Sequence, residues 1–192
     1  MRVPLYISFA VLIQAVGLVG ASDCQAQRDN STAVISATLA SVYEMLGTSR
    51  DAVIQGPIAF DPRVLRTGRG RAPRNWPDSV VLKWVGDVSD SVFSHQRVRT
   101  MLDSANLHAR SPIHWVPCGL SAGAGQCAPR EFAAVVSVSE PWICNDVAQV
   151  IASIRYRSTD ELHPSAWQAS VIRLTRKDGR WIAGAWYAQA SN

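Results

Sequence analysis

The sequence predicts an α+β domain in which N-terminal helices pack on a curved antiparallel sheet that ends in a four-strand meander. Apolar residues recur at helical spacing in the first half of the chain, whereas β-branched and aromatic residues dominate four segments of the second half. The last two of these segments flank Asp178-Gly179, which is a strong two-residue hairpin signal. A chain of 192 residues is long enough for one such domain.

The first 26 residues have the layout of a secretory signal peptide. A basic residue precedes the almost entirely apolar stretch 5–20, and small and polar residues then lead to Ala26. Cleavage after Ala26 leaves residues 27–192 as a single domain without a transmembrane segment, so we expect an exported protein, periplasmic or secreted. Two alternatives stay open: retention of the apolar stretch as a membrane anchor, and acylation at Cys24, although an aspartate precedes that cysteine.

The mature chain begins with an amphipathic helix. Asn30, Ser31 and Thr32 each suit the N-cap position, and Gly47 ends the helix. The helical spacing between them is carried by Val34, Ile35, Leu39, Val42, Tyr43 and Leu46. This pattern indicates about four turns with one face to bury.

The middle of the chain has weaker signals. Residues 53–60 favour a short edge strand, and residues 61–77 favour a surface loop because they are rich in Arg, Gly and Pro. We expect a short helix over residues 78–85 and a second helix over residues 89–102. The second helix would bury Val92, Phe93, Val98, Met101 and Leu102.

The second half of the chain predicts the meander. Its four strands are expected at residues 132–138, 148–156, 167–175 and 181–188. Trp181 and Trp186 are five residues apart, so on a regular strand their side chains point to opposite faces. Both can join one core only if the strand contains a bulge near Gly184.

The run 171–182, with its charged Asp-Gly turn and following tryptophan, resembles the closing hairpin of nuclear-transport-factor-2-like domains, which have a cystatin-like α+β fold. The longer segment 132–186 is similar to the C-terminal part of exported bacterial proteins without an assigned activity. Nuclear-transport-factor-2-like domains often enclose a conical pocket, and their enzymatic members place Asp or His inside it. The resemblance therefore makes Asp146, Glu140 and His114 the first candidates for pocket residues.

The cysteines of an exported protein are candidates for disulfides. Cleavage removes Cys24 and leaves three cysteines, of which Cys118 and Cys127 enclose a Gly-rich segment that closes easily. We expect these two to form a disulfide, worth about 3 kcal/mol in chain entropy. Cys144 lies among apolar residues and is expected to be a buried thiol.

No metal or cofactor is expected. His108, His114 and Cys118 have a spacing that matches no recognised zinc-ligand pattern. The chain also contains no Gly-rich phosphate loop and no nucleophile elbow.

Arginines concentrate in the predicted loop 61–77, with Trp76 near its end. Arginine beside an aromatic residue is the composition of an anion-binding site. The candidates are Arg63, Arg66, Arg69, Arg71 and Arg74. The net charge of +4 is small, so nucleic acid is not an expected partner, and a solvated loop is the simpler interpretation.

Together these patterns predict an exported, non-catalytic domain that binds a small molecule or a protein partner. The alternative is a pocket enzyme of the nuclear-transport-factor-2-like type, in the isomerase, dehydratase or hydrolase class. A charged residue facing a concave apolar pocket would favour the enzyme.

Overall fold

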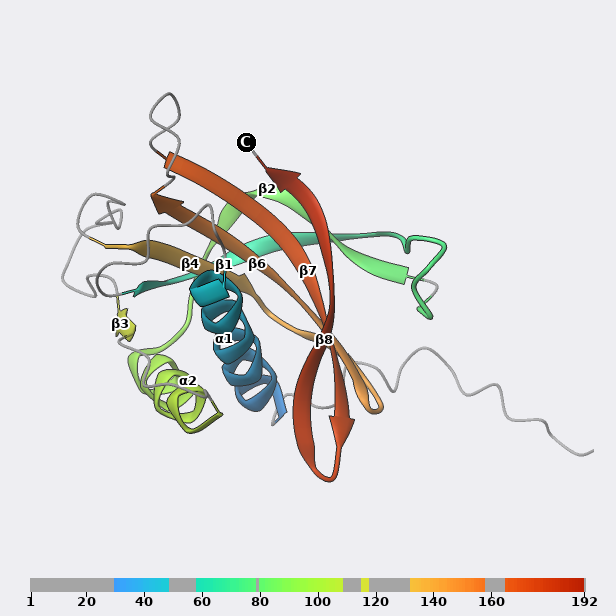
Figure 1. Ribbon diagram of the computed structural model, residues 1–192, viewed down its shortest axis with the longest axis horizontal. Coiled ribbons are helices and arrows are strands. Elements are labelled where there is room, and N and C mark those ends of the chain that lie inside the picture. Colours follow the sequence, from blue (N-terminus) through green and yellow to red (C-terminus); the bar gives the residue numbers. More distant parts are fainter. Residues whose placement is uncertain are drawn as a thin grey trace, which may run out of the picture.

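The computed structural model describes residues 30–48, 58–78, 80–108, 115–117, 132–157 and 165–191. Over these ranges the chain forms an α+β fold with two helices and a curled eight-stranded sheet (Figure 1). The elements are α1 (Ser31–Thr48), β1 (Ile58–Arg71), β2 (Val80–Val92), α2 (His95–His108), β3 (Trp115–Pro117), β4 (Ala134–Ser139), β5 (Trp142–Cys144), β6 (Val147–Arg157), β7 (Ser165–Lys177) and β8 (Arg180–Ser191). Neither described helix is long and apolar enough to cross a membrane.

The α+β class is confirmed, but the order of the elements differs from the predicted one. The sheet order is β2-β1-β4-β6-β7-β8, with β3 beside β1 and β5 beside β6. The strands β4, β6, β7 and β8 form the predicted antiparallel meander. However, α2 follows the first two strands, and β1 pairs in parallel with β3 and β4. A crossover through a helix, such as the one through α2, is what brings a returning strand parallel to an earlier one.

The prediction of a surface loop over residues 61–77 is wrong for residues 61–71, which belong to β1, whereas residues 72–77 lie in the connection between β1 and β2. Strand β1 continues to Arg71 and pairs with β2, with Gly68 beside Lys83 and Gly70 beside Val81. The short helix expected over residues 78–85 is wrong for the same reason, because most of it belongs to β2. Arginine and glycine are poor strand formers in isolation, but pairing and packing against the rest of the sheet override that preference.

Helix α2 begins later than expected. The Ser94 hydroxyl accepts a hydrogen bond from the Arg97 backbone N–H at 3.3 Å, so Ser94 is the N-cap and the helix starts at His95. Val92, predicted in the helix core, ends β2 and is 54 % exposed. The other predicted core residues, Phe93, Val98, Met101 and Leu102, are buried.

Both helices pack on one face of the sheet, which we call the inner face. Helix α1 contributes Val34, Ile35, Leu39, Val42 and Leu46, as its spacing predicted. Helix α2 adds Val98, Met101, Leu102 and Ala105, and the sheet adds alternate residues of β1, β4, β6 and β7. This is the main core of the domain.

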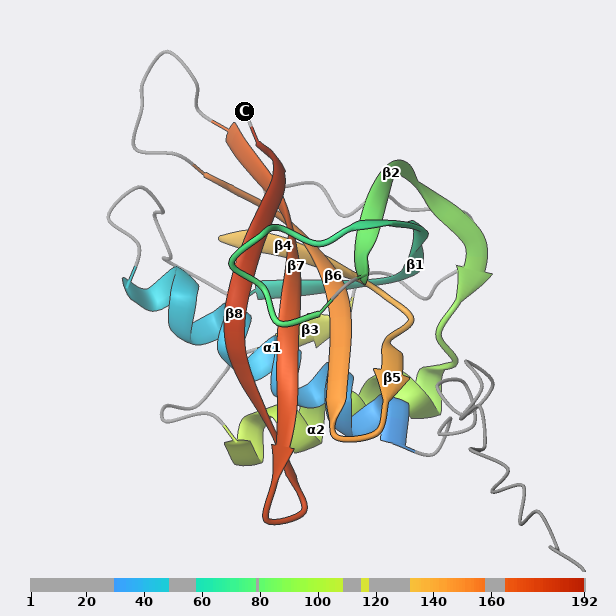
Figure 2. The same ribbon diagram turned by 90° about the vertical axis from the view of Figure 1, so that its right-hand side faces the viewer.

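The opposite, outer face of the sheet is partly covered by the far part of the β1–β2 hairpin, residues 65–84, which we call the arm. Figure 2 shows the turn of the arm crossing in front of β7 and β8, with the helices on the other side of the sheet. In agreement, the rings of Trp76 in the arm and Tyr187 on β8 meet edge to face at 6.0 Å. A second, smaller core joins arm and sheet through Leu65, Val81, Leu82, Ile151 and Val171.

One side-chain amide from β6 satisfies the free backbone edge of the arm. Gln149 is fully buried; its Oε1 accepts from the Leu82 N–H at 2.9 Å and its Nε2 donates to the Val80 carbonyl at 3.0 Å. The same Nε2 reaches Asp78, which forms an ion pair with Arg173 of β7. Gln149 thus replaces the neighbouring strand that β2 lacks on this side.

A second amide continues this arrangement from β8. Ala190 and Ala188 face consecutive residues of β7, so Gln189 between them is the extra residue of a β-bulge. The Gln189 amide accepts from the Trp84 backbone N–H and donates to the Leu82 carbonyl. We call Gln149 and Gln189 the amide clamps of the arm.

Strand β8 contains the bulge that was predicted as the condition for Trp181 and Trp186 to join one core. Trp186 and Ala183 face β7 residues that are two apart, so either Gly184 or Ala185 is an extra residue. This bulge turns the strand between the two tryptophans. Trp181 is buried in the main core and Trp186 packs against the same core.

Replacing the buried clamp is expected to destabilise the fold. In Gln149→Leu the buried Leu82 N–H and the part-buried Val80 carbonyl lose their hydrogen-bond partner, so the free energy of unfolding should fall by about 2–4 kcal/mol. Urea denaturation followed by circular dichroism measures this. The control Gln96→Ala, on the exposed surface of α2, should change it by less than about 0.5 kcal/mol. Equal effects of the two changes would contradict the clamp.

Candidate functional site

A buried carboxylate lies on the outer face, near the start of β1. Because Phe60 points into the main core, its neighbour Asp61 points to the opposite side, where it is 3 % exposed. Its Oδ1 accepts from the Arg63 backbone N–H at 3.1 Å and from Nε at 3.0 Å, and its Oδ2 accepts from Nη2 at 2.6 Å. These hydrogen bonds raise the pKa of Arg63 above its ordinary value, against the opposing effect of burial.

A second guanidinium stands beside the same carboxylate. Arg155 of β6 places its Nη2 3.9 Å from Oδ2 of Asp61, beyond hydrogen-bond distance. Among the described residues this contact is the one interaction of the Arg155 side chain, which is 38 % exposed. Two guanidinium groups therefore share one carboxylate, and only that of Arg63 is hydrogen-bonded to it.

Two hydroxyl side chains lie next to these charges. Ser137 of β4 pairs with Asp61 on one side and with Ser153 of β6 on the other, and directly opposite residues share a face of the sheet. Arg155 is two residues beyond Ser153 and so lies on that face too. We call Asp61, Arg63, Ser137, Ser153 and Arg155 the outer-face cluster.

Two tryptophans border the outer-face cluster on the β7 side. Trp167 of β7 lies directly opposite Arg155, and its ring is 4.9 Å from the ring of Trp84 in the arm. The indole Nε1–H of Trp84 is buried and has no hydrogen-bond acceptor within the described part of the chain. Buried donors are nearly always paired in native proteins, so this N–H needs an explanation.

The arrangement favours binding of an acceptor. The Arg155 guanidinium and the Trp84 indole supply N–H donors, and the two serines can donate as well. Asp61 contributes little as an acid or base because Arg63 already occupies its oxygens.

The two described pocket candidates, Asp146 and Glu140, are not brought together. Asp146 is exposed in the β5–β6 turn, where its carbonyl accepts from the Arg176 N–H. Glu140 is exposed after β4 and forms an ion pair with Arg97 of α2 at 2.6 Å. That arginine also donates to Ser31 and lies over the ring of Phe93, so the pair joins both helices to the sheet. The third candidate, the histidine at position 114, lies outside the described residues.

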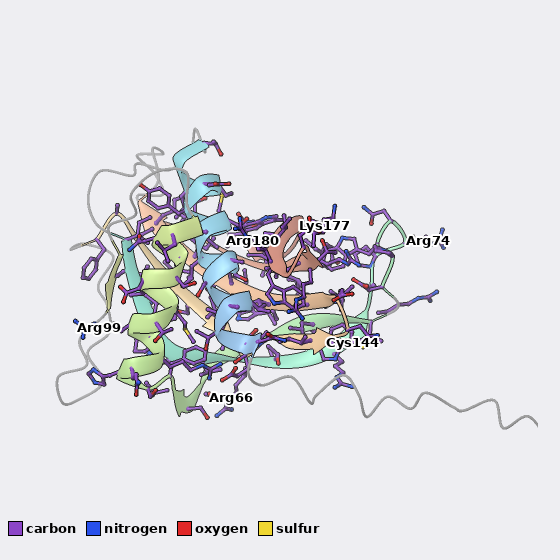
Figure 3. The ribbon with its side chains drawn as sticks, turned by 90° about the horizontal axis from the view of Figure 1, so that it is seen from below. Arg66, Arg74, Arg99, Cys144, Lys177 and Arg180 are labelled. Carbon is purple, nitrogen blue, oxygen red and sulfur yellow. The ribbon has the colours of Figure 1, made fainter. Side chains whose placement is uncertain are left out.

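The five candidate arginines do not form one anion-binding loop. Arg63 is occupied by the neighbouring carboxylate, and Arg69 and Arg71 are exposed on β1 rather than in a loop. Figure 3 shows Arg74 at the turn of the arm and Arg66 in a different part of the molecule. The predicted surface is therefore dispersed along the hairpin.

The expectation for the cysteines also changes. Cys144, at the end of β5, is disulfide-bonded rather than a free thiol. The predicted disulfide partners Cys118 and Cys127 lie outside the described residues. If Cys24 is removed with the signal peptide, these two are the cysteines of the mature chain with which Cys144 can pair.

Sequence reasoning did not single out Asp61, Arg155 or Trp84. One signal was available, because an aspartate directly after the apolar run 58–60 is unusual within a buried strand. The position of Arg155 gave no signal, since its role depends on β4 lying between β1 and β6.

No family model, curated protein or solved structure matches this chain, so the site is interpreted from its own residues. Among the described residues, no three His, Cys, Asp or Glu side chains gather as metal ligands would.

Truncating the buried carboxylate should weaken the fold more than truncating the exposed one. Asp61→Ala removes every hydrogen bond to Arg63 at a buried position, so we expect the free energy of unfolding to fall by about 2–4 kcal/mol. Glu140→Ala breaks an ion pair whose carboxylate is half exposed, and should cost less than about 1 kcal/mol. Chemical denaturation compares the two, and the opposite ranking would contradict the assignment.

Peptide mapping without reduction should find Cys144 joined to Cys118 or Cys127 in the mature protein. The enclosed chain segment predicts a stabilisation of about 3 kcal/mol, which Cys144→Ser should remove. A peptide joining Cys118 to Cys127, together with alkylation of Cys144, would show that the pairing is wrong.

Proposed function

We propose that this chain is an exported, non-catalytic domain that binds a small molecule at the outer-face cluster, between the arm and β4. The single observation that carries the proposal is the buried Trp84 indole N–H, which has no acceptor among the described residues. Across β6 from it lies the Arg155 guanidinium, which donates no hydrogen bond to the described residues. A bound molecule that supplies acceptor atoms would satisfy both groups.

The position of the site supports a small ligand rather than a flat protein surface. Arm and sheet meet through the second core and the amide clamps, so a molecule beside Trp84 lies against the wall that they form. Small-molecule sites commonly combine such an apolar wall with a few placed polar groups.

The state of the charges supports binding rather than catalysis. A general base needs an acceptor that is free to take a proton from the substrate. Asp61 is committed to Arg63, and the two described pocket candidates, Glu140 and Asp146, are exposed at separate places.

We further propose that the domain works outside the cytoplasm. The N-terminal layout with its expected cleavage after Ala26 supports export, and the disulfide of Cys144 fits an oxidising compartment, periplasmic or extracellular.

A relation to nuclear-transport-factor-2-like domains remains part of this proposal. It is supported by a helix packed on the inner face of a curled sheet and by the closing hairpin β7–β8. At the turn of that hairpin, Asp178 and Gly179 both have positive φ, as a two-residue turn of this kind requires.

Native mass spectrometry of the full chain, expressed in a bacterium that exports it, tests the proposal. We expect a mass that begins at residue 27, and a fraction of the protein carrying a small molecule. In Ser153→Phe the new ring fills the space beside the outer-face cluster, so the bound fraction should disappear. The matched control Ser91→Phe lies on an exposed part of β2 and should retain it.

Thermal unfolding checks that both variants fold, and Ser153→Leu serves if the larger side chain disrupts the sheet. Retention of the molecule by folded Ser153 variants would place it elsewhere and overturn the proposed site. A stoichiometric complex with a protein instead would show that the domain binds a partner. An unprocessed N-terminus would contradict cleavage.

A further inference from the structure

The charges of the outer-face cluster indicate which class of small molecule it binds. We infer, resting on the proposed function, that the ligand has one carboxylate that pairs with Arg155 and, at its other end, a neutral oxygen that accepts from the Trp84 indole N–H.

The net charge of the cluster determines which ligand charge it favours. Asp61 is the one acidic side chain that contacts Arg63 or Arg155 among the described residues, so the three side chains together carry one uncompensated positive charge. One negative charge on the ligand neutralises the site, whereas a dianion would bring an additional charge next to the buried carboxylate of Asp61.

The two arginines differ in whether their N–H groups are available to a ligand. Arg63 directs Nε and Nη2 to Asp61, while Arg155 lies beyond hydrogen-bond distance of it. A guanidinium is planar and presents paired N–H groups that match the two oxygens of a carboxylate. Arg155 is therefore the side chain that can receive the acid group, and Ser153 two residues earlier on the same face can add a hydroxyl donor.

The positions of Arg155 and Trp84 set the length of the ligand. Arg155 extends from β6 towards Asp61 of β1, across β4, whereas Trp84 contacts Trp167 of β7 on the opposite side of β6. The charged donor and the neutral donor therefore lie on opposite sides of one strand. A molecule that engages both needs a separate acceptor at the end remote from its carboxylate.

The chemistry of the Trp84 indole determines which acceptor fits there. The Trp84 indole has a single N–H and carries no charge. It therefore favours a ligand with an acceptor atom at this position and does not require that atom to be charged. A hydroxyl or carbonyl oxygen is sufficient.

Nuclear magnetic resonance of the indole N–H groups tests this inference on the mature protein labelled with ¹⁵N. The signal of Trp84 is identified as the one lost in Trp84→Phe. The probes are 4-hydroxybenzoate, its neutral analogue 4-hydroxybenzamide, and benzoate, which lacks the second oxygen. We expect 4-hydroxybenzoate to shift the Trp84 signal in a saturable manner, and each analogue to bind at least about tenfold more weakly.

Two arginine variants provide the matched comparison. Arg155→Met keeps an unbranched apolar stem but removes the guanidinium and its charge, and should weaken 4-hydroxybenzoate at least about tenfold while leaving 4-hydroxybenzamide unchanged. Arg66→Met removes an exposed arginine of the same protein and should leave both probes unchanged.

The outcomes separate this inference from the proposed function. Equal binding of 4-hydroxybenzoate and 4-hydroxybenzamide at Trp84 would overturn the carboxylate and leave the small-molecule site standing. Equal binding of benzoate would overturn the second oxygen. If no probe moves the Trp84 signal although native mass spectrometry shows a Ser153-dependent ligand, the ligand class is wrong and the site is retained. If neither method detects a ligand, both proposals fail.

Discussion

The outer half of this structure depends on how the backbone edge of β2 is satisfied. A strand at the end of a sheet leaves every second N–H and carbonyl without a strand partner, and here that edge lies over the sheet rather than in solvent. The amide clamps Gln149 and Gln189 accept and donate at alternate residues of β2, as a further strand would. The arm can therefore pack against the outer face with these backbone groups of β2 paired.

This arrangement gives the two faces of the sheet different roles. The inner face carries the helices and the main core, and its side chains are apolar along β4, β6 and β7. The outer face is apolar under the arm and around Ala59 and Val135, and between these two regions it contains the polar outer-face cluster. Within the cluster Asp61 and Ser137 are buried, whereas the side chains of Arg63 and Arg155 are partly exposed. Because Trp84 belongs to the arm, the clamp that holds its backbone also sets the position of its indole.

Residue spacing and turn residues were sufficient to predict the elements that are specified by neighbouring residues in the sequence. The spacing of Val34, Leu39 and Leu46 located α1, and Asp178-Gly179 located the last hairpin. The distance between Trp181 and Trp186 even required the bulge that the structure contains. The arm could not be predicted in this way, since its arginines and glycines form strands only because β2 and the outer face are present. The same holds for the site: Asp61 and Arg155 are 94 positions apart in the sequence numbering, and they meet because β4 lies between their strands.

The amide clamps also affect the order in which the chain folds. Leu82 and Gln149 are 67 residues apart, and Trp84 and Gln189 are 105 residues apart, so these contacts close long loops and form late. When the chain emerges with its amino terminus first, β1 and β2 are complete well before the last strand, β8, has appeared. Until then Leu82 and Trp84 have no sheet to cover, and the hairpin presents an apolar edge that can pair with another chain. If the chain is exported, as we propose, this topology favours a slow or assisted passage, because the strand that secures its first hairpin is the last to arrive.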